Sequence, residues 1–467
     1  MAVLCGIIII KERLSMRFYN TLTNKLEEFH SIEEKQITMY VCGATIYDDI
    51  HIGNARPIIF FDTLRRFFEF SGYEVNYVSN ITDIDDKIIA RAQLNGISEA
   101  QLTKKYEKAL FDVYSYLGAT PSKTPCATAY LNEMIAYVKN LLEKGYAYLI
   151  EDDGVYFSVD KVADYGILSN QKTQNLLEGT RGILNQNKKC PLDFSLWKLT
   201  KDNGIKYNSP WGLGRPGWHT ECAVINKVIF KKEIDIHGGG SDLRFPHHEN
   251  EIAQTYATDC HYLARFFMHV GRLDFLNEKM SKSVGNVVYV KDFINDGIHP
   301  FVLRFLLLNS SYRQPINYSS ELLEQSIIET EKYRLFLKKN YFKLVLNSVN
   351  IQNDLENIDS RQAVTITKFL ACLEDDFNVT NALMIINKTI KELNANRSFI
   401  IENLEIFKNK YLDIIVMLNI LGLFDIESLK CNDDDLQNYT KWTMAKEAKD
   451  FILADEYRKL LVQKELI

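Results

Sequence analysis

One pattern near the N-terminus constrains the fold more than any other feature of the chain. Residues 36–43, QITMYVCG, alternate apolar side chains as a strand does, and residues 56–73 have the spacing of a helix that ends at Gly72. Residues 74–80, EVNYVSN, follow as a second strand. A strand, helix and strand in this order predict a βαβ unit of a doubly wound sheet. The loop at residues 43–55 is then expected over the carboxyl ends of the strands, where such sheets bind ligands.

The rest of the chain divides into regions of different pattern. Residues 101–148 are helical in pattern, and the Gly- and Asp-dotted stretch 151–170 predicts a small inserted β-rich module. Residues 233–240, EIDIHGGG, predict a strand followed by a glycine turn. From about Ile298 the pattern is almost wholly helical. Because 467 residues are too many for one hydrophobic core, we predict an α/β, doubly wound parallel (Rossmann-type) domain with an insertion, followed by an all-α C-terminal region.

Composition and charge limit the partners that this chain can have. Hydrophobic residues make up 46% and charged residues 25%, as in an ordinary globular protein. The net charge of −6 lacks the basic excess of a general nucleic-acid binder, so RNA would have to bind through local patches. The eight cysteines contain no CxxC pair, which favours a reducing cytoplasm over a disulfide scaffold.

The first 15 residues raise a separate question. Their apolar stretch of about ten residues is shorter than the ~20 residues that a membrane-spanning helix needs. No positively charged start and no small-residue cleavage site of a signal peptide accompany it. We therefore expect no membrane association, and we treat residues 1–15 as an N-terminal extension, with Met16 as the alternative natural start.

The loop YDDIHIGNAR at residues 47–56 leads into the first predicted helix. A helix N-terminus presents unpaired N–H groups and a partial positive charge, which favour a phosphate. Gly53 would let a phosphate or a ribose approach the backbone, and His51 and Asn54 can donate hydrogen bonds to it. A polar turn capped by Asn54 is the alternative, because so short a motif is weak without its context.

A cationic loop, EKMSKSVGN, lies far downstream at residues 278–286. Lys279 and Lys282 could neutralise charge on a triphosphate, and such stabilisation carries most of phosphoryl and nucleotidyl chemistry. An ordinary solvated Lys/Ser loop is the alternative. An HIGH-like loop after the first strand of a βαβ unit, together with KMSKS, resembles the class I aminoacyl-tRNA synthetases.

Four scattered residues could form a soft metal site. Cys42 ends the first predicted strand, Cys222 lies in GWHTEC, and His247 and Glu251 share one face of a predicted helix. Two thiolates, an imidazole and a carboxylate suit Zn²⁺. Alternatively, the cysteines are small buried hydrophobes and His247–Glu251 is a helix pair. Spacing alone leaves both interpretations open.

Longer segments in a fixed order resemble one family, the cysteinyl-tRNA synthetases. The resemblance is dense from Met16 to Ser319 and thinner beyond. The segments that carry it are MYVCGATIYDDIHIGNAR, YVSNITDIDDKIIARA, PLDFSLWK, SPWGLGRPGWHTEC, DIHGGGSDLRFPHHENEIAQ, EKMSKSVGN and LRFLLLNSSYRQPINYS. It implies a cysteine–tRNA ligase that uses ATP, L-cysteine and tRNA(Cys), and we expect it to be monomeric and cytoplasmic.

The resemblance also assigns roles to individual residues. One Zn²⁺ per subunit would select the cysteine thiolate over serine, and Mg²⁺ would accompany the ATP. The implied zinc ligands are Cys42, Cys222, His247 and Glu251. The implied ATP-binding residues are His51, Gly53, Asn54, Lys279 and Lys282. His51 and Lys282 would be catalytic, with Lys282 gripping the leaving pyrophosphate. Trp218 and His237 would line the amino-acid pocket, with core packing as the alternative for Trp218.

The predicted domains follow from the same comparison. They are the extension 1–15, a catalytic domain of 16–128 and 213–259, an inserted module 129–212, a KMSKS and stem-contact region 260–323, a helical bundle 324–402 and a short anticodon-binding region 403–467. The family usually carries a second His where this chain has Asn54, and a short polar tail that this chain lacks.

Two rival functions share much of this pattern. A ligase that transfers cysteine to a small amine would have the same zinc site and loops, but the long helical C-terminal third favours tRNA. A non-catalytic, zinc-held binding protein would not need Lys279 and Lys282.

Overall fold

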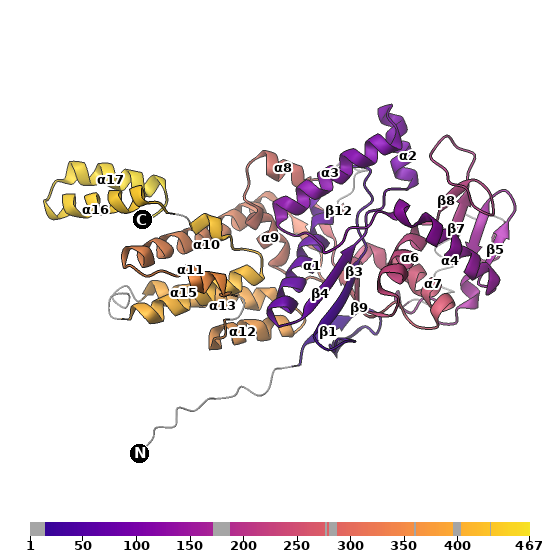
Figure 1. Ribbon diagram of the computed structural model, residues 1–467, viewed down its shortest axis with the longest axis horizontal. Coiled ribbons are helices and arrows are strands. Elements are labelled where there is room, and N and C mark those ends of the chain that lie inside the picture. The colour runs from indigo at the N-terminus through magenta and orange to yellow at the C-terminus, as the bar shows by residue number, and fades with distance from the viewer. Residues whose placement is uncertain are drawn as a thin grey trace, which may run out of the picture.

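The centre of the molecule is a four-stranded sheet in the order β10–β9–β3–β4 (Figure 1). The computed structural model describes residues 15–170, 187–275, 278–279, 287–358, 361–395, 403–429 and 431–467. The central strands are β3 (Gln36–Val41), β4 (Glu74–Ser79), β9 (Ile234–Gly240) and β10 (Ala264–Val270). Their pairings are all parallel, so the predicted doubly wound sheet is confirmed.

Helix α1 (Ile52–Phe70) connects β3 to β4 and packs on the sheet. It begins earlier than the predicted residue 56, because His51 caps its N-terminus. The predicted glycine turn after β9 is wrong, since the strand continues through its glycines to Gly240. A Cβ on Gly238 would lie 2.1 Å from the ring of Phe61 on α1. Close approach of helix and sheet, and not a turn, therefore requires glycine there.

The stretch 101–148, predicted to be helical, contains two α-helices. After α2 (Asp86–Asn95), helix α3 (Glu99–Leu117) ends at Gly118, whose φ of 60° is left-handed. Helix α4 (Leu131–Glu143) follows a short 3₁₀ turn. The segment between α3 and α4 runs beside β4, where Lys123 bridges to Val78. This long-range pairing has no signature in local helical periodicity.

The inserted module is an antiparallel sheet in the order β5–β6–β7–β8. Its strands are β5 (Ala147–Ile150), β6 (Gly154–Phe157), β7 (Phe194–Leu199) and β8 (Gly214–Pro216). Its core surrounds the fully buried Trp197 and includes residues of α4, α6 (Trp218–Phe230) and α7 (Glu249–Asp259). The module is thus packed directly onto the two helices that follow β8 and β9.

A small third sheet links the central sheet to the C-terminal helices. It has the order β12–β11–β13, and α8 (Val290–Asn295) and α9 (Pro300–Leu308) lie between β12 and β13 in the chain. Its strands are β11 (Leu273–Phe275), β12 (Glu278–Lys279) and β13 (Ile316–Tyr318), while β1 (Arg17–Asn20) and β2 (Lys25–Glu28) form a separate hairpin. Buried Arg304 of α9 donates to Thr63 and to the carbonyls of Leu117 and Leu421, and so ties α9 to α1, α3 and the C-terminal region.

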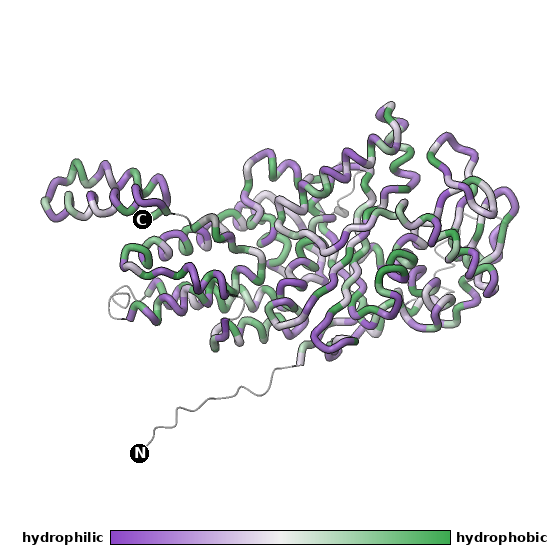
Figure 2. The backbone as a smooth tube through the Cα atoms, viewed as in Figure 1, coloured by the Kyte–Doolittle hydropathy of each residue, from purple (hydrophilic) through white to green (hydrophobic). Residues whose placement is uncertain are grey.

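The C-terminal third is helical, as predicted. Its helices are α10 (Ser320–Leu346), α11 (Gln352–Glu356), α12 (Val364–Glu374), α13 (Val379–Ala395), α15 (Leu404–Ile420), α16 (Asp433–Glu447) and α17 (Phe451–Gln463). Helices α16 and α17 form a hairpin at the far end, anchored by buried Phe342, Leu461 and Leu466 (Figure 1). Hydrophobic and hydrophilic residues alternate along this hairpin (Figure 2). Several of its apolar side chains are exposed, and Ile452 is 81% exposed.

The structure describes only part of the N-terminal region on which the expectations about an extension and a membrane segment depend. Residues 1–14 of the predicted extension lie outside the described residues. Within the described ranges, no helix combines the length and apolar character that crossing a bilayer requires.

Candidate active site and metal centre

A cavity of about 370 Å³ opens where the central strands end. Its wall is formed by the loop after β3, the first turn of α1 and the turn after β10. Residues of its lining include Cys42, His51, Gly53, Asn54, Trp218, Gly271 and Arg272. The loop that the sequence places over the strand ends therefore does line a cavity, at the position where doubly wound sheets bind ligands.

Four side chains beside this cavity converge on one point. One ligand atom each from Cys42, Cys222, His247 and Glu251 lies within 4.8 Å of the others, and all four side chains are buried. Cys42 Sγ lies 3.3 Å from Glu251 Oε1, and His247 Nε2 lies 3.1 Å from the same oxygen. Two thiols, an imidazole and a carboxylate in this arrangement could hold a metal ion.

Different elements deliver these four side chains. Cys42 follows β3 directly, and Cys222 lies one turn into α6. His247 is in the helical turn before α7, and Glu251 is in its first turn, so the i, i+4 spacing brings them together. Trp218 stacks on His247 with ring centroids 4.3 Å apart, lines the cavity and is 38% exposed. Core packing therefore does not account for Trp218.

The loop at residues 47–56, called the nucleotide-type loop from here on, is shaped by the N-terminal cap of α1. His51 Nδ1 accepts the N–H of Asn54 at 3.2 Å, which caps α1. A Cβ on Gly53 would lie 2.9 Å from that same nitrogen, so glycine is what allows the His51 ring to fold over the helix start. The first turn of α1 carries no acidic side chain. Its remaining N–H groups and partial positive charge suit an anion.

The segment after the KMSKS loop is joined to the same turn. Ile52 N–H donates to the carbonyl of Val288 at 3.0 Å, and Val290 N–H donates to that of Ile50 at 2.9 Å. Of Lys279 the structure describes the backbone alone, in β12, and Lys282 lies outside the described residues. The residues that follow the lysine-bearing segment, Val288 to Val290, therefore lie beside His51.

Comparison with known proteins identifies the family. A family model described as the catalytic domain of class I (C) tRNA synthetases matches residues 28–328. A protein of Acholeplasma laidlawii (strain PG-8A), named Cysteine--tRNA ligase, is 46% identical over 453 residues, which cover 97% of this chain and all of that protein. The protein of the same name from Onion yellows phytoplasma (strain OY-M) is 44% identical with equal coverage. The chain belongs to the cysteine–tRNA ligases.

Solved structures of other synthetases share the fold of this cysteine–tRNA ligase. A Mycobacterium tuberculosis methionyl-tRNA synthetase in complex with methionyl-adenylate has a TM-score of 0.58 at 16% identity, over 83% of this chain and 90% of that one. The Agrobacterium radiobacter K84 agnB2 LeuRS in a ternary complex has a TM-score of 0.64 at 11% identity, over 87% of each chain. Identities this low show the fold alone.

In this cysteine–tRNA ligase, two further histidines support the four converging side chains. His219 Nδ1 lies 2.9 Å from His247 Nδ1, which leaves His247 Nε2 directed at Glu251. His237 Nε2 lies 3.2 Å from Glu251 Oε2. His237 is fully buried behind the cluster and is not part of the described cavity lining, so it differs from the expected pocket wall. Contacts of this kind restrict the orientation of metal ligands.

A second, overlapping group was not foreseen from the sequence. Cys42, His237, His248 and Glu251 also place their ligand atoms within 4.8 Å of one another. His248 Nδ1 is engaged by His269 Nε2 at 2.8 Å. The first group contains two thiols and this one contains one, so a soft ion such as Zn²⁺ favours the first. The repeated histidines of FPHHENE are the signal that sequence reasoning passed over.

Burial sets the protonation states of the cluster. It raises the pKa of the Cys42 and Cys222 thiols, so both carry protons at neutral pH until an ion displaces them. It lowers the pKa of His247 to about 3, which keeps that imidazole neutral. A neutral imidazole is the form that binds metal.

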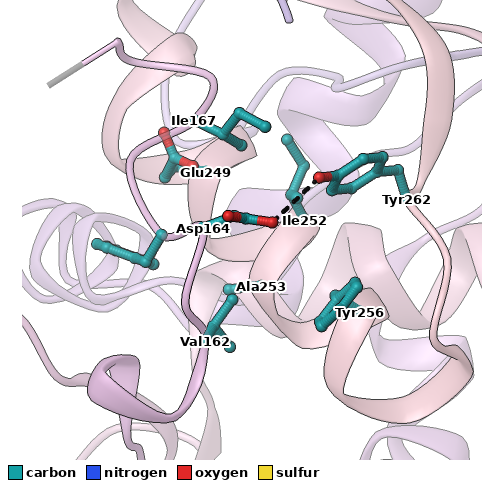
Figure 3. A pocket seen from close by; sticks show the side chains of 9 residues that line it. Val162, Asp164, Ile167, Glu249, Ile252, Ala253, Tyr256 and Tyr262 are labelled. Carbon is teal, nitrogen blue, oxygen red and sulfur yellow. Dashed lines mark hydrogen bonds between the residues drawn. The ribbon is translucent and has the colours of Figure 1, made fainter. Parts of the chain in front are cut away.

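A small separate cavity lies on the other face of α7 (Figure 3). Its volume of about 10 Å³ holds roughly one water molecule. Glu249 on its wall accepts the N–H of Ser169 at 2.8 Å, and Tyr262 donates to Asp164 at 3.5 Å (Figure 3). Glu251 points from the opposite side of the helix. The Ser169–Glu249 hydrogen bond joins the inserted module to α7. The cavity itself is too small for an amino acid or a nucleotide.

Proposed function

We propose that this cysteine–tRNA ligase activates L-cysteine with ATP, forms cysteinyl-adenylate and transfers the acyl group to tRNA(Cys). We further propose that one zinc ion, held by Cys42, Cys222, His247 and Glu251, selects the substrate thiolate over the serine hydroxyl. One observation carries the proposal: a buried thiol-rich cluster lies beside the cavity that the nucleotide-type loop of α1 also lines.

The donor set fits zinc by chemistry and by size. Zinc–ligand bonds of about 2.0–2.3 Å in a tetrahedron separate neighbouring ligands by about 3.3–3.8 Å. The contacts of 3.3 Å from Cys42 to Glu251 and 3.1 Å from His247 to Glu251 are close to that range.

Selection between cysteine and serine is the hardest task of such an enzyme. The two amino acids are nearly isosteric, and an ordinary pocket distinguishes such pairs by only about 10²-fold. When bound, zinc supplies a soft acid that takes a thiolate far more readily than a hydroxyl. We therefore propose that no separate editing reaction is needed. Trp218, stacked on His247, would close the pocket over the amino acid.

The residues on the opposite wall of the cavity would act in the activation step. The substrate carboxylate attacks the α-phosphorus of ATP in line, and pyrophosphate leaves. The first turn of α1, with His51, Gly53 and Asn54, would hold the phosphates by its N–H groups and partial charge. Lys282, supported by Lys279, would stabilise charge on the departing pyrophosphate, with Mg²⁺ accompanying the ATP. The protein thus contributes position and charge.

The tRNA would bind along the C-terminal third. Although the net charge of the chain is negative, the groove between α10 and α13 is basic. Its lysines are Lys332, Lys339, Lys343 and Lys391. Glu329 pairs with Lys332 at 2.6 Å and offsets part of this charge. A local basic groove is what an acidic chain needs to bind a polyanion. A monomeric state, a cytoplasmic location, the domain boundaries and anticodon binding by 403–467 stay predictions.

Transfer of labelled cysteine tests this proposal directly. We expect ATP-dependent formation of acid-precipitable Cys-tRNA(Cys), and cysteine-dependent ATP–pyrophosphate exchange without tRNA. Exchange with no transfer to tRNA would point instead to ligation of cysteine to a small amine. Failure of both reactions with the zinc-loaded protein would leave a non-catalytic binding protein.

A further inference from the structure

Arg56 is an unusual residue for the interior of a helix. It lies in the first half of α1, five residues after His51, and is 1% exposed. No carboxylate of the described ranges lies within ion-pair distance of its guanidinium, and burial lowers its pKa to about 10. Buried charges are normally paired. Arg56 is therefore a buried cation that has no counter-ion among the side chains that the structure describes.

The acceptors of Arg56 are backbone and hydroxyl oxygens from two distant segments. Nη1 donates to the carbonyls of Gly271 at 2.6 Å and Gln314 at 2.7 Å. Nη2 donates to the carbonyl of Ser311 at 3.1 Å and to the hydroxyl of Ser310 at 3.3 Å. A lysine could not span these positions, because its donors radiate from a single nitrogen.

The first of these segments leads into the lysine-bearing loop. Gly271 directly follows β10 and lines the active-site cavity. The chain continues through β11 into β12, which contains Lys279. The other end of the same segment is fastened to the α1 loop through Val288 and through the Lys291–Asp49 ion pair at 2.5 Å. Both ends of the segment are thus attached within one turn of the nucleotide-type loop.

We propose that Arg56 is a positioning residue for cysteine activation: it fixes the start of the KMSKS segment against the first turn of α1, and its charge, which no described carboxylate neutralises, adds to the positive field for the ATP phosphates. The proposal rests on the proposed function. It makes Arg56 a link between two parts of the ATP site, whereas the zinc cluster is independent of it.

Substitution of Arg56 by Lys tests the role of its forked donors while the charge is kept. Arg66→Lys is the matched control, because Arg66 is on the same helix and also donates to a backbone carbonyl, that of Gly118. For Arg56→Lys we expect kcat of cysteine-dependent ATP–pyrophosphate exchange to fall by about 10- to 100-fold, the usual cost of a misplaced reacting group. KM for cysteine and the zinc content should match those of Arg66→Lys.

The outcomes separate this inference from the proposed function. No exchange by the unaltered holoenzyme would contradict the proposed function itself. A kcat of Arg56→Lys within twofold of the unaltered enzyme would overturn the positioning role. Loss of zinc or of folded protein in Arg56→Lys would also overturn it, because Arg56 would then be purely structural.

Discussion

The two sides of the active-site cavity are built on different principles. The metal side consists of buried side chains: Cys42, Cys222, His247 and Glu251 come from separate segments and are oriented by further histidines. The nucleotide side consists mainly of backbone, namely the first turn of α1, with a half-buried His51 and an exposed Asn54. The charged groups of that side are expected from the distant KMSKS segment.

This difference teaches where the chain can vary. The proposed metal side is expected to tolerate no exchange of donor atoms, because each proposed ligand is also part of the core. A nucleotide side that relies on N–H groups can exchange a side chain such as Asn54 and keep its main contacts.

Loss of one thiol should abolish zinc binding and leave ATP binding intact. In Cys222→Ser we expect the zinc to be lost and cysteine-dependent exchange to fall by about three orders of magnitude or more, because a hydroxyl is a poor ligand for zinc. Metal analysis of the purified protein and an ATP-binding assay would be run together. Cys260→Ser, at an exposed cysteine, is the control. Full zinc occupancy in Cys222→Ser would remove Cys222 from the ligand set.

Loss of one lysine should impair the reaction with ATP and leave zinc binding intact. Lys282→Ala is expected to lower exchange by roughly 10²- to 10³-fold, the scale of losing one oriented charge donor, while zinc content stays full. Lys104→Ala, an exposed lysine on α3, provides the comparison. A near-normal exchange rate in Lys282→Ala would take Lys282 out of the catalytic set, and a loss of zinc would show that the two sides are coupled.

The pH should act on the metal side through the thiols. The raised pKa values of Cys42 and Cys222 mean that the metal-free site holds two protons that an ion must displace. Zinc affinity should therefore fall as pH falls, by up to about 100-fold per pH unit. His247, with a pKa of about 3, adds no proton to this competition above pH 5. Chelator competition between pH 6 and 8 measures the slope, and a flat profile would contradict protonated thiols.

The smallest effect is expected at Asn54. Asn54→His restores the residue that the family usually has, but the Asn54 contact in this structure is its backbone N–H, which donates to His51. We expect exchange kinetics to change by less than about threefold, since the backbone carries the contact. Steady-state kinetics with varied ATP measure this change. A large gain in rate would contradict the prediction and show that the side chain at this position matters.

The sequence predicted much of this molecule because its motifs are local. The βαβ pattern of residues 36–80 needs only strand and helix periodicity, and the cluster of Cys42, Cys222, His247 and Glu251 came from segments whose order resembles a family. The i, i+4 spacing of His247 and Glu251 even fixes their contact before the fold is known.

The features that the sequence did not predict all depend on long-range packing. Gly238 looks like part of a turn until Phe61 is placed against it. His248 and His269 are ordinary histidines until the end of β10 brings them within 2.8 Å. Arg56 continues a helical pattern, and only the fold supplies acceptors more than two hundred positions away. Local periodicity contains no information about such contacts.

The most direct test of the account compares cysteine with serine in ATP–pyrophosphate exchange by the zinc-loaded enzyme. We predict that kcat/KM for serine is lower by at least about 10⁴-fold, beyond what an ordinary pocket achieves for near-isosteres, and that added Ser-tRNA(Cys) is not hydrolysed. Serine activation within about 100-fold of cysteine, followed by hydrolysis of Ser-tRNA(Cys), would contradict selection by the metal side.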